Sequence, residues 1–218
     1  GEGVVEAILK ERQMKGAFTS FYQFLKRLDT KKVGKKIVES LIDAGCFDFT
    51  GWSKDALRMS LDPIYETVSL QQKEESQGYL SLFSKMGDEE EKRFLTPPDV
   101  KIPRSKYELL LREKELLGIF LSGHPLQTYT EILERLSCVS IAKALELNHD
   151  AVFRSAFFIE SVTIRLSSKT QKKFAILMIS DGYESVELPI WSELYDEKSH
   201  LLQENRLLYA VLQLDKRE

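Results

Sequence analysis

EKELLGIFLSGHPL, residues 113–126, divides the chain into two kinds of sequence. Charged residues and leucines run as far as Gly118, a pattern typical of a helix that ends at a glycine. A Ser-Gly-His-Pro turn follows at residues 122–125. Upstream of this stretch apolar residues recur at helical spacing, whereas from about residue 151 onward the composition is that of strands. The stretch therefore predicts a joint between a helical part and a β part, as in an α+β protein.

Residues 1–70 are predicted to form the helical region. Ala44-Gly45 predicts the end of one helix, and Ser53 predicts the cap of the next. Each expected helix carries an apolar stripe at helical spacing, and these stripes comprise Val4, Val5, Ile8 and Leu9; Phe21, Phe24, Leu25 and Leu28; Ile37, Val38, Leu41 and Ile42; and Leu57 and Leu61.

Two further segments separate this region from the β part. Residues 71–104 are rich in Gln, Glu and Asp and contain Pro97-Pro98, which predicts a flexible acidic linker. Ser105 and Glu108 have the spacing of a capping box, so a helix is expected to begin there. Residues 105–150 are therefore predicted to be a helical connector.

Residues 151–218 have the pattern of a small β domain. Strands are expected over 151–166, 174–180, 186–190 and 207–214, with a helix over 192–203. Three strands, a helix and a fourth strand follow the order of an OB-fold barrel whose fifth strand is missing. The predicted fold class is therefore α+β, with a helical region followed by an incomplete OB-fold β-barrel.

Composition limits the classes of function. The chain has 218 residues, of which 43% are hydrophobic and 30% charged, and a net charge of −3. Residues 1–60 carry 11 basic and 8 acidic residues (+3), and residues 61–99 carry 4 and 9 (−5), so DNA contact is expected to be local. No apolar run reaches the roughly 18 residues that span a bilayer, so no membrane partner is expected. Cys46 and Cys138 lack metal-ligand spacing and suggest a reducing cytoplasm. The chain begins at Gly1 without Met, which predicts an excised piece of a longer protein.

Two glycine-containing turns are candidates for binding duplex DNA. Gly1-Glu2-Gly3 precedes a helix, and glycines let a backbone approach a phosphate at a helix N-terminus. A second turn, at Gly45, follows a lysine-rich stretch. A core helix and an ordinary helix C-cap with solvated lysines are the competing interpretations. The candidate residues are Gly1, Gly3, Lys31, Lys32, Lys35, Lys36 and Gly45.

The β region offers a candidate surface for a single strand. Basic residues follow a nucleic-acid backbone, and aromatic rings stack on bases. Most aromatic residues of a small barrel must fill its core, so the basic hairpin Arg165–Lys173 is the better candidate, with Phe174 and Tyr183 as weaker ones. The predicted residues are Arg165, Lys169, Lys172, Lys173 and Phe174.

A short apolar stretch lies inside the acidic segment. Tyr79, Leu80, Leu82 and Phe83 are crowded into polar sequence that cannot bury them, so they predict a docking motif. The alternative is a turn that packs on the core of this protein.

No catalytic or metal-binding constellation is expected. His124, His149 and His200 lack the spacing of zinc ligands or of a nucleophile–base pair. The carboxylates do not cluster on one strand, as two-metal phosphoryl transfer requires. No phosphate-binding loop motif is present. Neither a cofactor nor a catalytic residue is therefore predicted in this chain.

Three strings together resemble one family. They are Gly-x-Gly-Val-x-Glu-Ala-Ile at residues 1–8, Leu-Ile-x-Ala-Gly-x-Phe-Asp at residues 41–48 and Leu-Ser-Gly-His-Pro-Leu at residues 121–126. Their order resembles that of the bacterial DNA polymerase III alpha subunits, downstream of the catalytic palm. The resemblance implies helix-hairpin-helix contacts to duplex DNA, an OB domain near single-stranded template and a sliding-clamp motif at residues 79–83.

The resemblance also implies the setting of the parent protein. That protein would be a DNA-directed DNA polymerase of the cytoplasm that uses Mg²⁺, with DNA, the sliding clamp and other holoenzyme subunits as partners. The chain itself would position and tether DNA without catalysis. The alternative is a protein-interaction scaffold of the replisome with little direct DNA binding, which the near-neutral charge favours.

Overall fold

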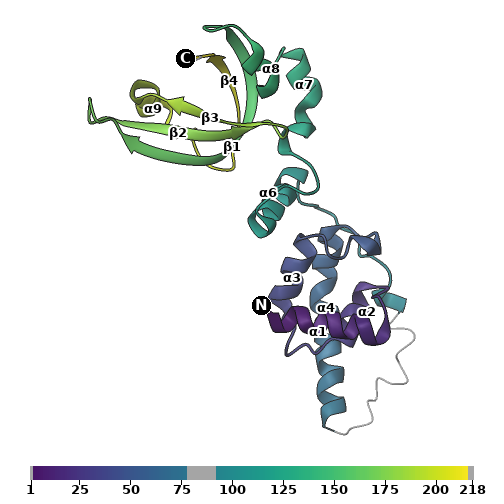
Figure 1. The fold of residues 1–218 in the computed structure, drawn as a ribbon. Helices are drawn as coiled ribbons and strands as arrows, with labels where there is room; N and C mark the ends of the chain where they lie inside the picture. Colours follow the sequence, from purple (N-terminus) through teal and green to yellow (C-terminus); the bar gives the residue numbers. More distant parts are fainter. Residues whose placement is uncertain (1, 78–91, 216–218) are drawn as a thin grey trace. The chain divides into compact units, whose positions relative to one another are not determined.

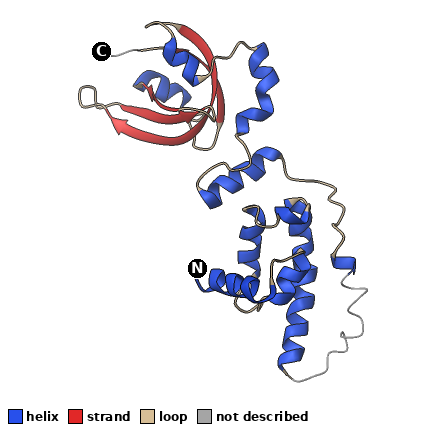
Figure 2. Cartoon of the chain, turned by 45° about the vertical axis from the view of Figure 1, so that its right-hand side comes forward, coloured by secondary structure: helices blue, strands red, loops and turns tan. Residues whose placement is uncertain are grey.

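The computed structural model describes residues 2–77 and 92–215 of the chain. The chain divides into two compact units, Gly1–Gly118 and Ile119–Glu218. The first unit is helical and the second contains the strands (Figures 1 and 2). The division lies inside the 113–126 stretch and splits the expected 105–150 connector between the two units.

The helical unit follows the predicted pattern closely. Its helix α4 continues to Ser76, so the first residues of the expected linker are helical. The elements of the unit are α1 (Glu2–Lys15), α2 (Phe21–Arg27), α3 (Lys35–Asp43), the 3₁₀ turn η1 (Asp48–Thr50), α4 (Lys54–Ser76) and α6 (Lys106–Leu117).

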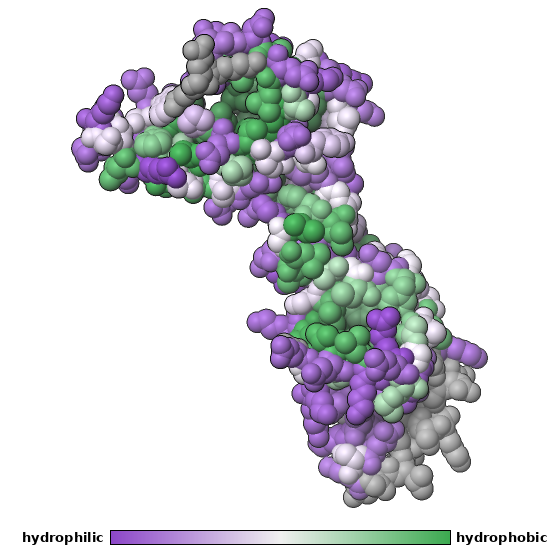
Figure 3. Space-filling model, in the orientation of Figure 1, coloured by the Kyte–Doolittle hydropathy of each residue, from purple (hydrophilic) through white to green (hydrophobic). Residues whose placement is uncertain are grey.

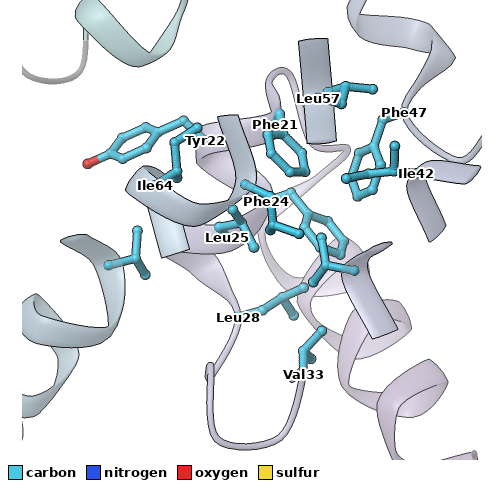
Figure 4. Packing of buried hydrophobic residues seen from close by; sticks show 13 residues of the cluster. Phe21, Tyr22, Phe24, Leu25, Leu28, Val33, Ile42, Phe47, Leu57 and Ile64 are labelled. Atoms are coloured by element: carbon cyan, nitrogen blue, oxygen red, sulfur yellow. The ribbon is translucent and has the colours of Figure 1, made fainter. Parts of the chain in front are cut away.

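Aromatic side chains form the centre of the helical core (Figure 4). The ring of Phe47 meets Phe21 and Phe24 edge to face, with centroid separations of 4.9 and 4.8 Å. Such pairs stabilise a core beyond the area that they bury. The predicted stripes of α2 and α4 are confirmed, because their members are buried: Phe21, Phe24, Leu25, Leu28, Leu57 and Leu61.

The stripe predicted for α1 is half wrong. Val4 and Ile8 pack against the core, but Val5 and Leu9 are 56% and 48% exposed. No residue of α1 is fully buried. The helix therefore meets the core along a narrow line, and the broad apolar stripe overestimates its contact.

A buried carboxylate joins three parts of the helical unit. Asp43, at the end of α3, is 1% exposed. It accepts hydrogen bonds from Arg58 at 3.2 Å, Arg104 at 3.2 Å and Arg112 at 3.2 Å. Arg58 lies on α4 and Arg112 on α6, so these contacts fix α6 to α3 and α4. The buried Glu113 lies 3.8 Å from the Lys54 ammonium and adds a second ionic contact.

Local capping explains where the helices begin and end. The Ser53 hydroxyl accepts from the Ala56 N–H, and Ser105 and Glu108 form the predicted capping box. Gly118 ends α6 with a φ of 79°, a left-handed conformation that favours glycine. These predictions from sequence are confirmed.

The strands form a curled antiparallel sheet. Within the described residues its four strands are β1 (Val152–Leu166), β2 (Lys173–Ser180), β3 (Ser185–Ile190) and β4 (Leu207–Gln213), in the order β3-β2-β1-β4. The first half of β1 pairs with β4 and the second half with β2, with an irregularity between Ile159 and Ser161. This half-barrel confirms the prediction of an incomplete OB fold. Helix α9 (Ser192–Lys198) is shorter than predicted, since the chain turns after Lys198.

The core of the sheet unit lies on the inner face of this curled sheet. Figure 3 shows apolar residues in its hollow. Phe157, Ile159, Leu177 and Ile179 are buried there. Helix α8 (Ile141–Glu146) contributes Ile141 to the same cluster.

The Ser-Gly-His-Pro turn packs on the sheet. His124 precedes η3 (Pro125–Tyr129), and its Nδ1 accepts from the Leu126 N–H at 3.3 Å. Its ring meets Phe120 and Phe158 edge to face. Gly182, in the β2–β3 turn, lies so close that a Cβ there would be 2.7 Å from His124 Cγ. The turn therefore fits His124 only because residue 182 lacks a side chain. Helix α7 (Thr130–Arg135) follows.

Asp181 joins the β2–β3 turn to α8. Its carboxylate accepts from the backbone N–H of Ile141 at 2.8 Å, and from Tyr183 and Glu184 at 3.0 Å each. Burial alone would raise the pKa of Asp181, but these backbone hydrogen bonds outweigh it and lower that pKa. The ionised carboxylate thus holds the turn and the first turn of α8 together.

No helix in the described part of the chain is both long and apolar enough to span a bilayer.

Candidate nucleic-acid interface

The predicted lysines gather at the turn between α2 and α3. Lys31 and Lys32 lie in this turn, and Lys35 and Lys36 form the first turn of α3. The Asp29 carboxylate accepts from the Lys31 N–H at 2.9 Å, and the buried Val33 anchors the other side of the turn. A short, internally bonded turn thus presents all four lysine side chains to solvent.

The four lysines differ in their electrostatic surroundings. Lys35 forms a salt bridge with Asp62, and this hydrogen bond raises the pKa of Lys35. Lys31, Lys32 and Lys36 take part in no salt bridge within residues 2–77 and 92–215. Gly34 precedes α3 and supplies no side-chain cap to the first N–H groups of the helix. Three ammonium groups and a helix N-terminus are together suited to phosphate oxygens.

The predicted glycines have different roles. Gly3 lies in the first turn of α1, with nothing within 4 Å of a Cβ placed there. Gly1 lies outside the described residues. Gly45 ends α3 with a φ of 83°, where its N–H donates to Ile42 and that of Cys46 donates to Leu41. This pattern is a Schellman motif. Gly45 therefore has a clear role in ending a helix, one of the two interpretations that its sequence leaves open.

Only some of the residues predicted to bind a single strand lie on the same face of the sheet. Arg165 on β1 lies directly opposite Phe174 on β2, so the two side chains share one face. Lys173 lies opposite Leu166, on the other face. Lys169 and Lys172 lie in the connection between the two strands, the hairpin at the left of Figure 1.

One aromatic residue of this surface was not among the predicted contacts. Trp191 follows β3 directly and is 56% exposed, and its ring lies 5.9 Å from that of Phe174 at an angle of 32°. The sequence offered a signal, since Trp191 ends an alternating strand at the turn into a helix. Tyr183, a weaker candidate, is 85% exposed in the β2–β3 turn.

The remaining predicted residues cannot be placed. Tyr79, Leu80, Leu82 and Phe83 lie outside the described residues. For the part of the chain that is described, no group of His, Cys, Asp or Glu is arranged to hold a metal ion.

Comparison with known proteins first gives the class of the helical unit. Residues 1–57 match the model of the helix-hairpin-helix motif. The range includes the lysine-bearing turn and the Schellman turn at Gly45. The chain therefore combines a helix-hairpin-helix region with a sheet of OB type.

Comparison along the whole chain gives the particular family. The chain is 47% identical over 219 aligned residues to the DNA polymerase III subunit alpha of Chlamydia pneumoniae, covering all of this chain and 18% of that protein. Identity to the same subunit is 29% in Borreliella burgdorferi and 27% in Escherichia coli K12, each over 95% of this chain. The chain is thus homologous along its full length to one segment of the DNA polymerase III alpha subunits. It spans about a fifth of their length.

Proposed function

We propose that this chain is the DNA-positioning segment of a DNA-directed DNA polymerase that works in chromosomal replication in the cytoplasm. The parent would carry out Mg²⁺-dependent nucleotidyl transfer elsewhere in its sequence. The observation that carries the proposal is the group of exposed ammonium groups at the α2–α3 turn, inside the range that matches the helix-hairpin-helix motif.

The chemistry of this turn favours the phosphate backbone over the bases. Lysine ammonium groups and helix N–H groups recognise phosphate oxygens, which are the same at every base pair. A replicative polymerase has to hold all sequences alike, so such contacts suit it. The Arg165 side of the sheet unit would hold the single-stranded template near the duplex.

The first test is charge reversal at the turn. Replacing Lys31, Lys32 and Lys36 by Glu is expected to weaken binding of duplex DNA by about 30-fold at low salt, because three phosphate contacts are lost. Fluorescence anisotropy with a labelled duplex measures this. As a matched control, Lys73, Lys101 and Lys106 are exposed lysines of the same unit outside residues 1–57. Their reversal to Glu should have a much smaller effect. Equal losses in both triple variants would mean that only net charge matters and would reject the turn as a site.

We further propose that residues 79–83 bind a sliding clamp. Leu82 and Phe83 would fill an apolar pocket, since clustered apolar residues in polar sequence need a partner. A weak clamp anchor and weak phosphate contacts on one chain would reinforce each other through effective concentration.

A pull-down on immobilised clamp tests this second contact. Leu82→Ala with Phe83→Ala is expected to abolish retention of the chain. The control pair Leu95→Ala with Ile102→Ala removes residues that are 48% and 91% exposed, and should leave retention intact. Undiminished retention of the Leu82/Phe83 variant would remove the motif from the proposal.

A protein-interaction scaffold is the competing function. The net charge of −3 favours it. Duplex binding that is absent even at low salt would leave this as the function of the segment.

A further inference from the structure

We infer that two residues of α4, Gln72 and Tyr65, position the lysine-bearing turn between α2 and α3 for contact with the phosphate backbone. The inference rests on the proposed DNA-positioning function and adds residues that act on the DNA site without touching DNA. They act through Thr30, which directly precedes Lys31 and Lys32 in the chain.

All three polar groups of Thr30 are bonded to α4. The Thr30 N–H and hydroxyl both donate to Gln72 Oε1, at 3.0 and 2.9 Å. The Thr30 carbonyl accepts from the Tyr65 hydroxyl at 2.7 Å. The Gln72 amide also donates to the Leu28 carbonyl at 2.7 Å, so one glutamine holds the turn on both sides of Asp29. Tyr65 and Gln72 are two helical turns apart and therefore lie on the same face of α4.

Apolar burial holds only the two ends of this turn. Leu28 and Val33 are 4% and 2% exposed and belong to the helical core (Figure 4). Asp29, Lys31 and Lys32 lie between these ends and are exposed. The hydrogen bonds to α4 therefore hold the part of the turn that the core does not reach.

The C-terminal end of α4 is suited to holding the turn rather than to filling the core. The buried residues of α4 stop at Val68, yet the helix continues to Ser76. Gln72 lies in this continuation, and it bonds residues that are 42 and 44 positions earlier in the chain. The last turns of the helix thus reach the candidate DNA site without adding a buried residue to the core.

A turn with a fixed backbone binds phosphates more tightly than a mobile one. Ordering a loop on binding costs conformational entropy, and a loop that already has its bound shape avoids that cost. The apparent affinity falls in proportion to the fraction of molecules in which the turn has this shape. Gln72 and Tyr65 are uncharged, so their effect on phosphate binding comes through this fraction.

The test measures duplex binding by the 218-residue chain with fluorescence anisotropy at low salt. Gln72→Met is expected to weaken binding about fivefold, because methionine suits a helix but cannot form the three hydrogen bonds to the turn. Tyr65→Phe removes one hydroxyl and should weaken binding about threefold. Gln71→Met is the matched control, since the adjacent Gln71 forms no hydrogen bond to the turn within the described residues. It should leave the affinity unchanged.

Two readouts distinguish positioning from a general loss of stability. Gln72→Met leaves the charge of the chain unchanged, yet it should reduce the steepness of log affinity against log salt by about 0.9, the share of one phosphate contact. In the variant with Lys31, Lys32 and Lys36 replaced by Glu, Gln72→Met should have no further effect on duplex binding, because the contacts that it positions are already gone.

Urea unfolding shows whether each variant is folded during the assay. The chain has two tryptophans, and Trp52 packs against the helical core, so Trp191→Phe leaves a signal from the helical unit alone. Should Gln72→Met be unfolded, Tyr65→Phe allows the same comparisons.

The outcomes separate this inference from the proposed function. If the lysine variant loses duplex binding but folded Gln72→Met binds like Gln71→Met, the inference is overturned while DNA positioning stands. If Gln72→Met weakens binding equally with and without the three lysines, Gln72 does not act through them and the inference is likewise overturned. If the unaltered chain does not bind duplex even at low salt, both the inference and the proposed function are rejected.

Discussion

Asp43→Ala is expected to destabilise the helical unit by about 3 kcal/mol, because it removes the buried partner of three arginines. Removing Asp43 takes the carboxylate out of the buried side of the network. Its three partners keep only their more exposed carboxylates: Arg58 keeps Glu39, Arg104 keeps Asp55 and Arg112 keeps Glu115. Arg58, Arg104 and Arg112 would also repel one another across the vacated space. Their side chains are about one-third exposed, which lets water relieve part of the penalty and places the loss at the lower end of the usual range.

Urea unfolding followed by the fluorescence of Trp52 measures this loss in the helical unit. Trp191→Phe in all samples removes the signal of the sheet unit. The matched control is Asp62→Ala, since Asp62 is also an aspartate paired with a basic residue, but its side chain is 59% exposed. That exposed pair is expected to contribute much less than Asp43, because solvent screens it. Similar losses for both variants would show that Asp43 acts as an ordinary surface ion pair.

Gly182→Ala is expected to destabilise the sheet unit by about 3 kcal/mol, through backbone strain and a steric clash. The φ of residue 182 is 93°, a region that alanine rarely adopts, and its Cβ would lie 2.7 Å from His124 Cγ and 2.9 Å from His124 Cβ. Because the His124 ring is enclosed by Phe120 and Phe158, it cannot easily move away. Urea unfolding followed by Trp191 fluorescence in the Trp52→Phe background measures the effect.

Two controls separate the clash from the backbone strain. Gly118, at the end of α6 in the helical unit, has a similar φ of 79° but open space around a Cβ. Gly118→Ala, followed by Trp52 fluorescence in the Trp191→Phe background, should therefore cost only the backbone part, about 1 kcal/mol. In a His124→Ala background, Gly182→Ala should likewise lose most of its effect, since the clashing ring is gone. An unchanged cost of Gly182→Ala in that background would show that the ring does not require a glycine at position 182.

Local signals in the sequence predicted the elements of the fold well. Ser53, Ser105, Glu108 and Gly118 act within a few residues of their own positions, so the residue types alone indicate where helices begin and end. The order of strands identified the OB-type sheet for the same reason. The prediction of how much of α1 contacts the core was wrong. The width of that contact depends on how the neighbouring helices pack and not on the periodicity of α1 itself.

Long-range pairing was not accessible from the sequence. Asp43 meets Arg58, Arg104 and Arg112 across separations of 15, 61 and 69 residues. No spacing rule connects such positions. The same contrast holds for the candidate interface. The lysines of the α2–α3 turn are neighbours in sequence and could be predicted, whereas Trp191 lies beside Phe174 only because β2 pairs with β3.

The sequence of strand β2 is constrained on both faces of the sheet. Ala175, Leu177 and Ile179 fill the core, while Phe174, Ile176 and Met178 lie on the outer face of the sheet. A one-residue insertion or deletion in β2 would exchange these two sets, placing the outward side chains, the Phe174 ring among them, in the core and the apolar core side chains on the surface. Changes of length in this part of the chain are therefore confined to the hairpin beyond Leu166 and to the turn after Ser180, while β2 itself can vary only by substitution.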